Sequence, residues 1–231
     1  MSLILHIDTA TEIAHVSIAN NGLILRWLTN SSQKDHAAFV QVAIQQLVAD
    51  TGISLKDLDA IAVVAGPGSY TGLRVGMASA KGLCYALDKP LIALDTLIVW
   101  AASAKQATKD PANPHLLFCP MIDARRQEVF TAIYDQNLEI ILAPCAMILD
   151  KTSFTGQLLN NNILFFGSGA EKWKQLCNNP HASFINSTIL PEAISRLAFE
   201  LHTRKIYTEL VESQPVYLKD FQDSAKKSLP I

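Results

Sequence analysis

The chain has 231 residues, 49% of them hydrophobic and 17% charged, so it can build one large or two small globular cores and is too apolar for a disordered protein. Its formal net charge of −2 argues against nucleic-acid binding through bulk electrostatics, while leaving room for a local basic patch. The N-terminal residues lack a basic segment, and no apolar run approaches the roughly 18 residues of a membrane span. We therefore expect a cytoplasmic protein with no membrane segment.

The first 30 residues predict three antiparallel strands. Residues 3–9 are apolar and end in Asp-Thr, and residues 13–19 are rich in β-branched side chains. Asn20-Asn21-Gly22 is typical of a hairpin turn, because Asn-Gly tolerates positive φ, and residues 23–29 return as a third strand. Residues 34–51 then carry an apolar stripe at helical spacing, which predicts a helix.

The next segment alternates strands and helices. Residues 61–65 read as a buried strand that stops at a Gly-Pro-Gly turn and leads into a helix at 72–87. A short strand at 91–94 and a helix at 96–107 follow. This order, β-β-β-α-β-α-β-α, is that of a ribonuclease-H-like half.

A polar linker at 105–114 precedes what we interpret as a repeat of the same pattern. Residues 116–123 form a strand ending in Ile-Asp, as the first strand does, and residues 163–166 run into Gly167-Ser168-Gly169 as the earlier strand runs into its glycine turn. The alternative is that the chain is not duplicated, because any two α/β segments share such an order of strands, turns and helices.

The pattern predicts a duplicated ribonuclease-H-like α/β fold with two lobes, as in actin, sugar kinases and Hsp70, with mixed sheets flanked by helices and a nucleotide cleft between the lobes. The expected lobes are residues 1–107 and the smaller 115–231, with the last helix, 191–204, able to pack back on the first lobe. In this arrangement Asp8 and Asp123 would face each other across the cleft.

Residues suited to binding a nucleotide or anion follow the predicted strands. An Asp-Thr pair there can order a metal-bound water and contact phosphate oxygens, but it also serves as a turn or cap. The glycine turn brings N–H groups to a helix start and Arg74 can clamp a phosphate, although packing alone would also explain such a turn. The candidate set is Asp8, Thr9, Gly66, Gly68, Ser69, Thr71, Arg74, Gly167 and Gly169.

Two helices predict a surface for another subunit. Gly72, Gly76 and Ala80 recur every four residues, and so do Ala78, Gly82 and Ala86; small residues at this spacing let another helix approach closely. Burial within the same chain explains the pattern equally well. The predicted interface set is Val40, Ile44, Leu47, Gly72, Gly76, Met77, Ala80 and Cys84.

The sequence indicates neither a metal site nor a disulfide framework. The four cysteines are widely spaced without a CxxC motif, and the six histidines show no HxxxH or HxxE spacing. No catalytic triad is recognisable, so we expect no catalytic and no metal-binding residues.

Three segments together resemble the bacterial TsaB (YeaZ) family over nearly the whole chain: Ile7–Glu12 (IDTATE), Gly66–Gly76 (GPGSYTGLRVG) and Ile122–Val129 (IDARRQEV). The resemblance implies an actin-like fold and a role in making N6-threonylcarbamoyladenosine beside the anticodon of tRNAs that read codons beginning with A. It implies an obligate, non-catalytic partner of the transferase TsaD, which pairs through its first two helices in a four-helix bundle and can also self-associate. TsaE resets the complex, TsaC supplies its substrate, and tRNA is bound through the complex. It also implies ATP or ADP near the partner junction and no cofactor of the chain's own.

One departure from TsaD-like chains supports the non-catalytic role. Those chains hold a metal with an HxxxH motif after the third parallel strand, where this sequence has Thr96 and Trp100. Two alternatives remain open, an ATP-dependent kinase or ATPase that uses Asp8 and Asp123, and a metalloprotease.

Overall fold

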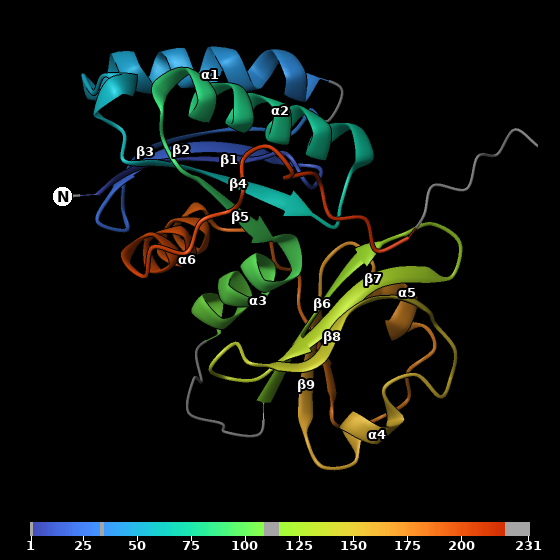
Figure 1. Ribbon diagram of the computed structural model, residues 1–231. Helices are drawn as coiled ribbons and strands as arrows, with labels where there is room; N and C mark the ends of the chain where they lie inside the picture. Colours follow the sequence, from blue (N-terminus) through green and yellow to red (C-terminus); the bar gives the residue numbers. More distant parts are fainter. Residues whose placement is uncertain (1, 33–34, 109–115, 220–231) are drawn as a thin grey trace, which may run out of the picture.

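The computed structural model describes residues 2–32, 35–108 and 116–219, which form two lobes, each built on a five-stranded mixed sheet (Figure 1). The expected linker falls partly in residues 109–115 and the polar tail in residues 220–231, both outside the described residues, as are Lys34 and His115. Within the described ranges, no helix is long and apolar enough to cross a membrane.

The first sheet has the strand order β3-β2-β1-β4-β5. Strands β1 to β3 form the predicted antiparallel meander, and β4 and β5 run parallel to β1. The strands are β1 (Leu3–Asp8), β2 (Ala14–Asn20), β3 (Leu23–Asn30), β4 (Ala60–Gly66) and β5 (Leu91–Asp95). Helices α1 (His36–Thr51) and α2 (Tyr70–Leu87) cover one face, and α3 (Thr96–Ala107) and α6 (Pro191–Thr203) lie on the other (Figure 1).

The second sheet has the order β8-β7-β6-β9-β10, which repeats the topology of the first strand for strand. Its strands are β6 (Leu116–Asp123), β7 (Glu128–Tyr134), β8 (Ile140–Ile148), β9 (Asn162–Phe166) and β10 (Ala182–Phe184). The predicted duplicated fold is therefore confirmed. In place of α1 and α2, the described part of this lobe has the short helices α4 (Thr155–Leu158) and α5 (Ala170–Lys174). A 3-10 turn, η2 (Leu55–Asp57), precedes β4 in the first lobe.

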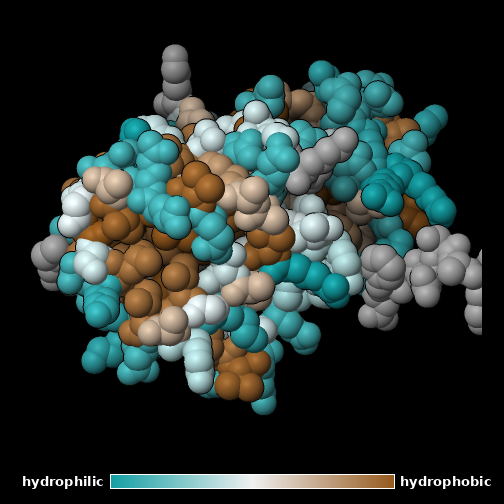
Figure 2. All heavy atoms as spheres, turned by 90° about the horizontal axis from the view of Figure 1, so that it is seen from above, coloured by the Kyte–Doolittle hydropathy of each residue, from teal (hydrophilic) through white to brown (hydrophobic). Residues whose placement is uncertain are grey.

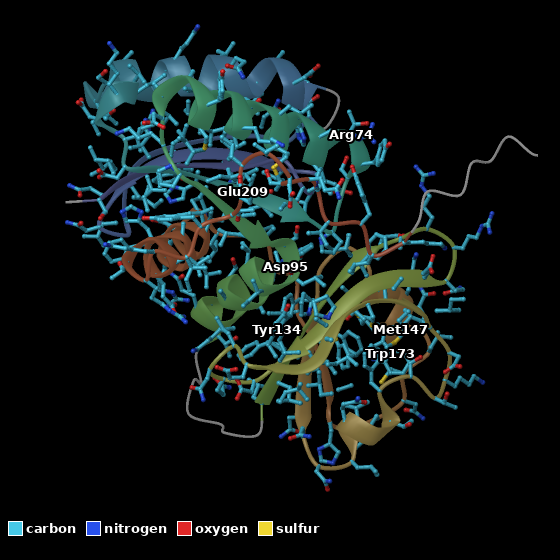
Figure 3. All side chains as sticks on the ribbon, viewed as in Figure 1. Arg74, Asp95, Tyr134, Met147, Trp173 and Glu209 are labelled. Atoms are coloured by element: carbon cyan, nitrogen blue, oxygen red, sulfur yellow. The ribbon has the colours of Figure 1, made fainter. Side chains whose placement is uncertain are left out.

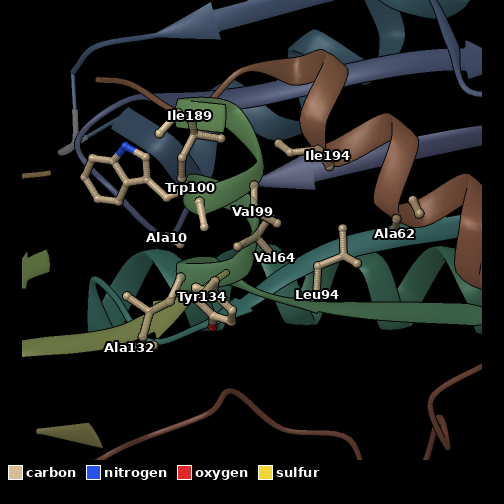
Figure 4. Packing of buried hydrophobic residues seen from close by; sticks show 14 of the residues in the cluster. Ala10, Ala62, Val64, Leu94, Val99, Trp100, Ala132, Tyr134, Ile189 and Ile194 are labelled. Atoms are coloured by element: carbon tan, nitrogen blue, oxygen red, sulfur yellow. The ribbon is translucent and has the colours of Figure 1, made fainter. Parts of the chain in front are cut away.

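Apolar side chains form three buried clusters, one of which joins the lobes. It contains Trp100 of α3, Tyr134 of β7, Ile194 of α6, Ile189 from the loop before α6, and Val64 and Leu94 from the first sheet (Figure 4). Because strands and helices of both halves contribute to one core, the lobes share a large apolar contact.

A segment that we call the C-terminal strap, residues 208–219, crosses the first lobe after α6 and ends against the second (Figure 1). The N–H of Thr208 donates to Leu91 O at 2.8 Å, and the N–H of Val216 donates to Ala65 O at 2.8 Å. Lys81 of α2 donates to the carbonyls of residues 211 and 213, at 3.1 and 2.8 Å. At its end, Lys219 pairs with Glu128 of the second lobe at 2.6 Å.

Candidate functional site: the cleft and the helix pair

A cleft of about 870 Å³ lies between the two lobes. Its walls are the β1–β2 and β6–β7 connections, the start of α2, and the turn after β9, closed on one side by the loop before α6. These segments are residues 10–13, 68–71, 122–125, 167–168 and 186–189. The cleft therefore lies at the carboxyl ends of β1, β4 and β6, the position at which α/β sheets bind ligands.

Both apolar and polar side chains line the cleft. Trp100, Ile122, Phe130 and Ile189 line it, and the Trp100 indole N–H donates to Ser187 O at 3.1 Å, so the tryptophan fixes the loop before α6. A lining of both kinds can contact the apolar and the polar parts of a small organic molecule.

The start of α2 is tied to the β1–β2 connection. The Ser69 N–H donates to Ala10 O at 2.7 Å, and the Ser69 hydroxyl accepts from the Gly72 N–H at 3.3 Å as the helix N-cap. Any Cβ at Gly68 would overlap Ala10 O, so glycine is required by this close approach. The glycine turn thus contacts the first loop of its own lobe directly.

Two residues predicted to bind phosphate are buried behind this contact. Asp8 has no exposed surface and accepts from the Ala10 N–H at 2.9 Å; its burial raises its pKa to about 7. The Thr9 hydroxyl, also buried, donates to Gly72 O at 2.6 Å. Asp8 therefore does not face Asp123 across the cleft, and that prediction is wrong.

Asp8 belongs to a buried polar row on the face of the first sheet that is turned toward the second lobe. It pairs in register with His15, and His6 pairs with Ser17, whose hydroxyl lies 3.1 Å from His6 Nδ1. Burial lowers the pKa of both histidines to about 4, so both are neutral at neutral pH.

On the opposite wall, Asp123 lines the cleft and is exposed. Partial burial disfavours its ionisation, but the 2.6 Å contacts from the Lys172 ammonium and the Arg125 N–H outweigh burial and hold its pKa below the usual value. Its charge is thus already matched by Lys172.

Of the predicted anion-binding residues, the cleft brings together Gly68, Ser69, Thr71 and Gly167. Gly66 lies beneath the strap, where a Cβ would be 2.6 Å from Val216 O, and a Cβ at Gly169 would be 2.7 Å from Val129 Cγ1. Both glycines thus serve packing, and Arg74 stands outside the cleft.

Arg74 instead forms a cluster with two tyrosines at the cleft mouth (Figure 3 shows it on α2). Its guanidinium carbon lies 4.0 Å from the centroid of the Tyr70 ring, and its Nε donates to the Tyr217 hydroxyl at 3.2 Å. The two tyrosine rings are 5.5 Å apart between centroids, so the strap and α2 meet here through aromatic side chains.

An actin-like cleft implies a nucleotide, and the residues present do not fit its phosphates. The hydroxyl and carboxylate of the first loop are engaged within the chain or buried, and the glycine turn is packed on Ala10. The sequence missed Trp100, Phe130 and residues 186–189 as cleft walls. The one sequence signal for these walls is the short polar segment Asn186-Ser187-Thr188 before Pro191, which indicates a loop.

Comparison with known proteins places the chain in a family. A family model described as "TsaD: tRNA N6-adenosine threonylcarbamoyltransferase" matches residues 29–211. The tRNA threonylcarbamoyladenosine biosynthesis protein TsaB of Bacillus subtilis is 32% identical over 176 residues, covering 75% of this chain and 74% of that protein. The chain belongs to the TsaB family. The Escherichia coli protein of the same name is 29% identical over 98% of both chains.

A solved structure agrees with this membership. A Pseudomonas aeruginosa protein described as similar to peptidase YEAZ has a TM-score of 0.81 and 26% identity, covering 95% of this chain and all of that one. The TsaB family takes part in tRNA threonylcarbamoyladenosine biosynthesis, which confirms the family resemblance found in the sequence.

In this TsaB-family chain the two positions aligned with the HxxxH histidines contribute to the core. Thr96 opens α3 and is fully buried, and Trp100 is 6% exposed. Within the described residues, no three His, Cys, Asp or Glu side chains are grouped so as to hold a metal ion.

The prediction that eight residues of α1 and α2 form the partner interface is wrong, because these residues are not at the surface. All eight are buried against the first sheet, because their side of each helix faces that sheet: Val40, Ile44, Leu47, Gly72, Gly76, Met77, Ala80 and Cys84.

The opposite sides of α1 and α2 form the exposed surface, which we call the outer helix face. It consists of Ala37, Ala38, Gln41, Val42, Gln45, Gln46 and Ala49 on α1, and Ala78, Gly82, Tyr85 and Ala86 on α2. Val42 is 61% and Tyr85 84% exposed. Figure 2 looks down on this side of the molecule and shows hydrophobic side chains gathered there among polar ones.

Proposed function

We propose that this chain is the obligate, non-catalytic partner of a TsaD-type subunit, and that it scaffolds and activates the transfer of a threonylcarbamoyl group to N6 of the adenosine next to the anticodon in tRNAs reading ANN codons. The observation that carries the proposal is the outer helix face. Among the exposed residues of α1 and α2, the charged ones are Asp50, which pairs with Arg26, and Arg74, which lies over the Tyr70 ring; the eleven residues of the outer helix face carry no charge, and so large an uncharged surface is unusual for exposed helices.

The chemistry of this face suits another pair of helices. Gly82 has no atom within 4 Å of its Cβ position, so a partner helix can approach α2 closely there. Lys81, the basic residue beside it, is turned to the strap carbonyls and adds no charge to the contact. Exposed Val42 and Tyr85 supply apolar area for burial.

The non-catalytic role is supported by Thr96 and Trp100, which pack into the core where related transferases carry metal ligands. No specific observation favours a kinase or a protease, since Asp8 is buried with a raised pKa and Asp123 is paired with Lys172. ATP or ADP then binds at the partner junction, TsaE acts on the assembled pair, and TsaC delivers the activated threonylcarbamoyl group.

Reconstitution tests this function. The chain is combined with TsaC, TsaD, TsaE, ATP, threonine, bicarbonate and tRNA, and the modified nucleoside is measured by mass spectrometry with and without it. Formation should depend on the chain, and equal formation without it would contradict an obligate role.

The contact surface is tested with Gly82→Arg and Val42→Arg, using Gly156→Arg as matched control because a Cβ at Gly156 also meets open space. Co-elution with TsaD should weaken at least about tenfold in the first two, since an unpaired charge would be buried, and stay unchanged in the control. Self-association of the chain should respond in the same way. Full retention of TsaD binding by both variants would exclude the outer helix face. Gly76→Arg is unsuitable here, because it would clash with Thr9 inside the lobe.

A further inference from the structure

We propose that the mouth of the cleft binds single-stranded RNA of the substrate tRNA, through Tyr70, Arg74 and Tyr217 on one rim and Arg125 and Arg126 on the other. This inference rests on the proposed function, because it takes tRNA as the substrate of the complex. The cleft mouth adjoins the outer helix face, because exposed Arg74 and Ala78 are one turn apart on α2, so the RNA would be bound next to the catalytic subunit.

The first rim offers flat surfaces for bases. Tyr70 is 37% and Tyr217 43% exposed, and Arg74 is exposed beside them. The guanidinium lies over the Tyr70 ring and donates to the Tyr217 hydroxyl, so all three side chains are held in place before any ligand binds. Aromatic rings and arginine planes are the surfaces on which proteins stack unpaired bases.

The second rim is the β6–β7 turn, which presents two exposed arginines. Arg125 and Arg126 both have left-handed backbone, with φ of 70° and 49°, an uncommon conformation for non-glycine residues. The turn is fixed by two hydrogen bonds at 3.1 Å, from the Ala124 N–H to Glu128 O and from the Glu128 N–H to Arg125 O. Arg125 and Tyr70 line the same cleft, so the rims oppose each other.

The charges at the mouth favour a polyanion despite the net charge of the chain. The carboxylates of Asp123 and Glu128 are paired with Lys172 and Lys219, each at 2.6 Å. Among the described residues, no ion pair includes Arg74, Arg125 or Arg126. Glu12 is the remaining acidic residue of the cleft wall. Arg125, Arg126 and the guanidinium N–H groups of Arg74 that Tyr217 does not accept are thus available to contact phosphates.

Single-stranded RNA fits this surface better than a duplex. Stacking on the tyrosines requires bases that are not already stacked in a helix, whereas duplex RNA is recognised through its shape, 2′-hydroxyls and phosphates. The adenosine modified under the proposed function lies beside the anticodon, within a loop, where such bases are available.

The test measures binding of an unmodified anticodon stem-loop RNA, labelled for fluorescence anisotropy, to the complex of this chain with TsaD over a range of salt concentrations. Arg125→Asn with Arg126→Asn removes both charges, and asparagine tolerates the left-handed backbone. Lys56→Asn with Lys89→Asn is the control, since these residues precede β4 and β5 at the opposite end of the sheet. Tyr217→Ala removes a stacking surface, and Tyr217→Phe keeps it.

The arginine variant should bind about fivefold or more weakly, with a salt slope shallower by about 1.4, as expected for two lost contacts to single-stranded phosphates. Tyr217→Ala should lose about fivefold or more and Tyr217→Phe should bind nearly as wild type, because base stacking depends on the ring. Unchanged affinity and slope in the arginine variant, with TsaD co-elution intact, would overturn the inference and leave the partner role standing. The co-elution of the Gly82→Arg and Val42→Arg variants with TsaD tests only the partner role and leaves the RNA-binding inference untouched.

Discussion

Gly76 and Gly82 of α2 lie on opposite sides of the helix, and substituting each by alanine tests whether the fold needs a glycine at that position. Gly76 faces the first sheet, where a Cβ would lie 2.5 Å from Thr9 Oγ1 and 3.5 Å from Val63 Cγ2. Gly82 faces outward, and its Cβ would meet nothing within 4 Å. Replacing each by alanine adds the same methyl group to the same helix in opposite environments.

The expected free energies follow from these contacts. At Gly76 the methyl group displaces the Thr9 hydroxyl, which donates to Gly72 O at 2.6 Å, and leaving these buried groups unpaired costs about 1–3 kcal/mol. The better helix propensity of alanine offsets about 1 kcal/mol of that cost. At Gly82 only the helix propensity changes, so Gly82→Ala should raise the free energy of unfolding by about 0.5–1 kcal/mol. Gly76→Ala should instead lower the free energy of unfolding, by up to about 2 kcal/mol.

Urea and thermal unfolding of both variants measure the difference, which corresponds to about 2–4 °C in Tm for each kcal/mol in a chain of this size. A double-mutant cycle identifies the cause, because in a Thr9→Ala background Gly76→Ala should lose most of its cost. Equal stabilisation by the two alanines, or an undiminished cost at Gly76 without the Thr9 hydroxyl, would refute the packing argument.

Two further predictions concern the buried polar row and the strap. Acidification from about pH 6.5 to 4 should lower the free energy of unfolding by about 3 kcal/mol for each of His6 and His15, because the unfolded histidines bind protons near pH 6.5 and the folded ones only near 4. Asp8 has the opposite effect, because its carboxyl binds a proton near pH 7 in the folded chain and only at lower pH in the unfolded chain, so acidification stabilises the fold through this residue. Without that contribution, Asp8→Asn should lose free energy of unfolding more steeply than the wild type as the pH falls, measured by urea unfolding. Lys81→Met should release the strap, with faster amide exchange at Val216 than in a Lys89→Met control; unchanged exchange would mean that other contacts hold it.

The sequence predicted most elements of the fold within one or two residues. The alternating strands, the Asn-Gly hairpin and the Gly-Pro-Gly turn are local signals, so β1 to β5 and the helices between them could be located. Strand β10 was missed. β10 has only three residues between polar segments, and α4 and α5 are too short for a helical period to show.

The candidate site was less predictable, because it depends on contacts between distant segments. The two small-residue series of α2, one through Gly76 and one through Gly82, have the same spacing, and only the position of the sheet decides which one is buried. Asp8 looks available at a strand end until the glycine turn, nearly 60 residues later, packs on Ala10. The strap over Gly66 comes from residue 216, beyond the reach of local patterns.

Helix α6 makes the first lobe depend on the last part of the chain. The Ser195 hydroxyl donates to Gly22 O at 3.0 Å, and Phe199 packs beneath Gly22, so the β2–β3 hairpin is completed by residues encoded far downstream. During synthesis on the ribosome, the part of the first sheet that α6 covers is therefore exposed until residue 203 has emerged. The first lobe is thus completed only after the second lobe has been synthesised, so the folding of one lobe depends on the other although each repeats the other.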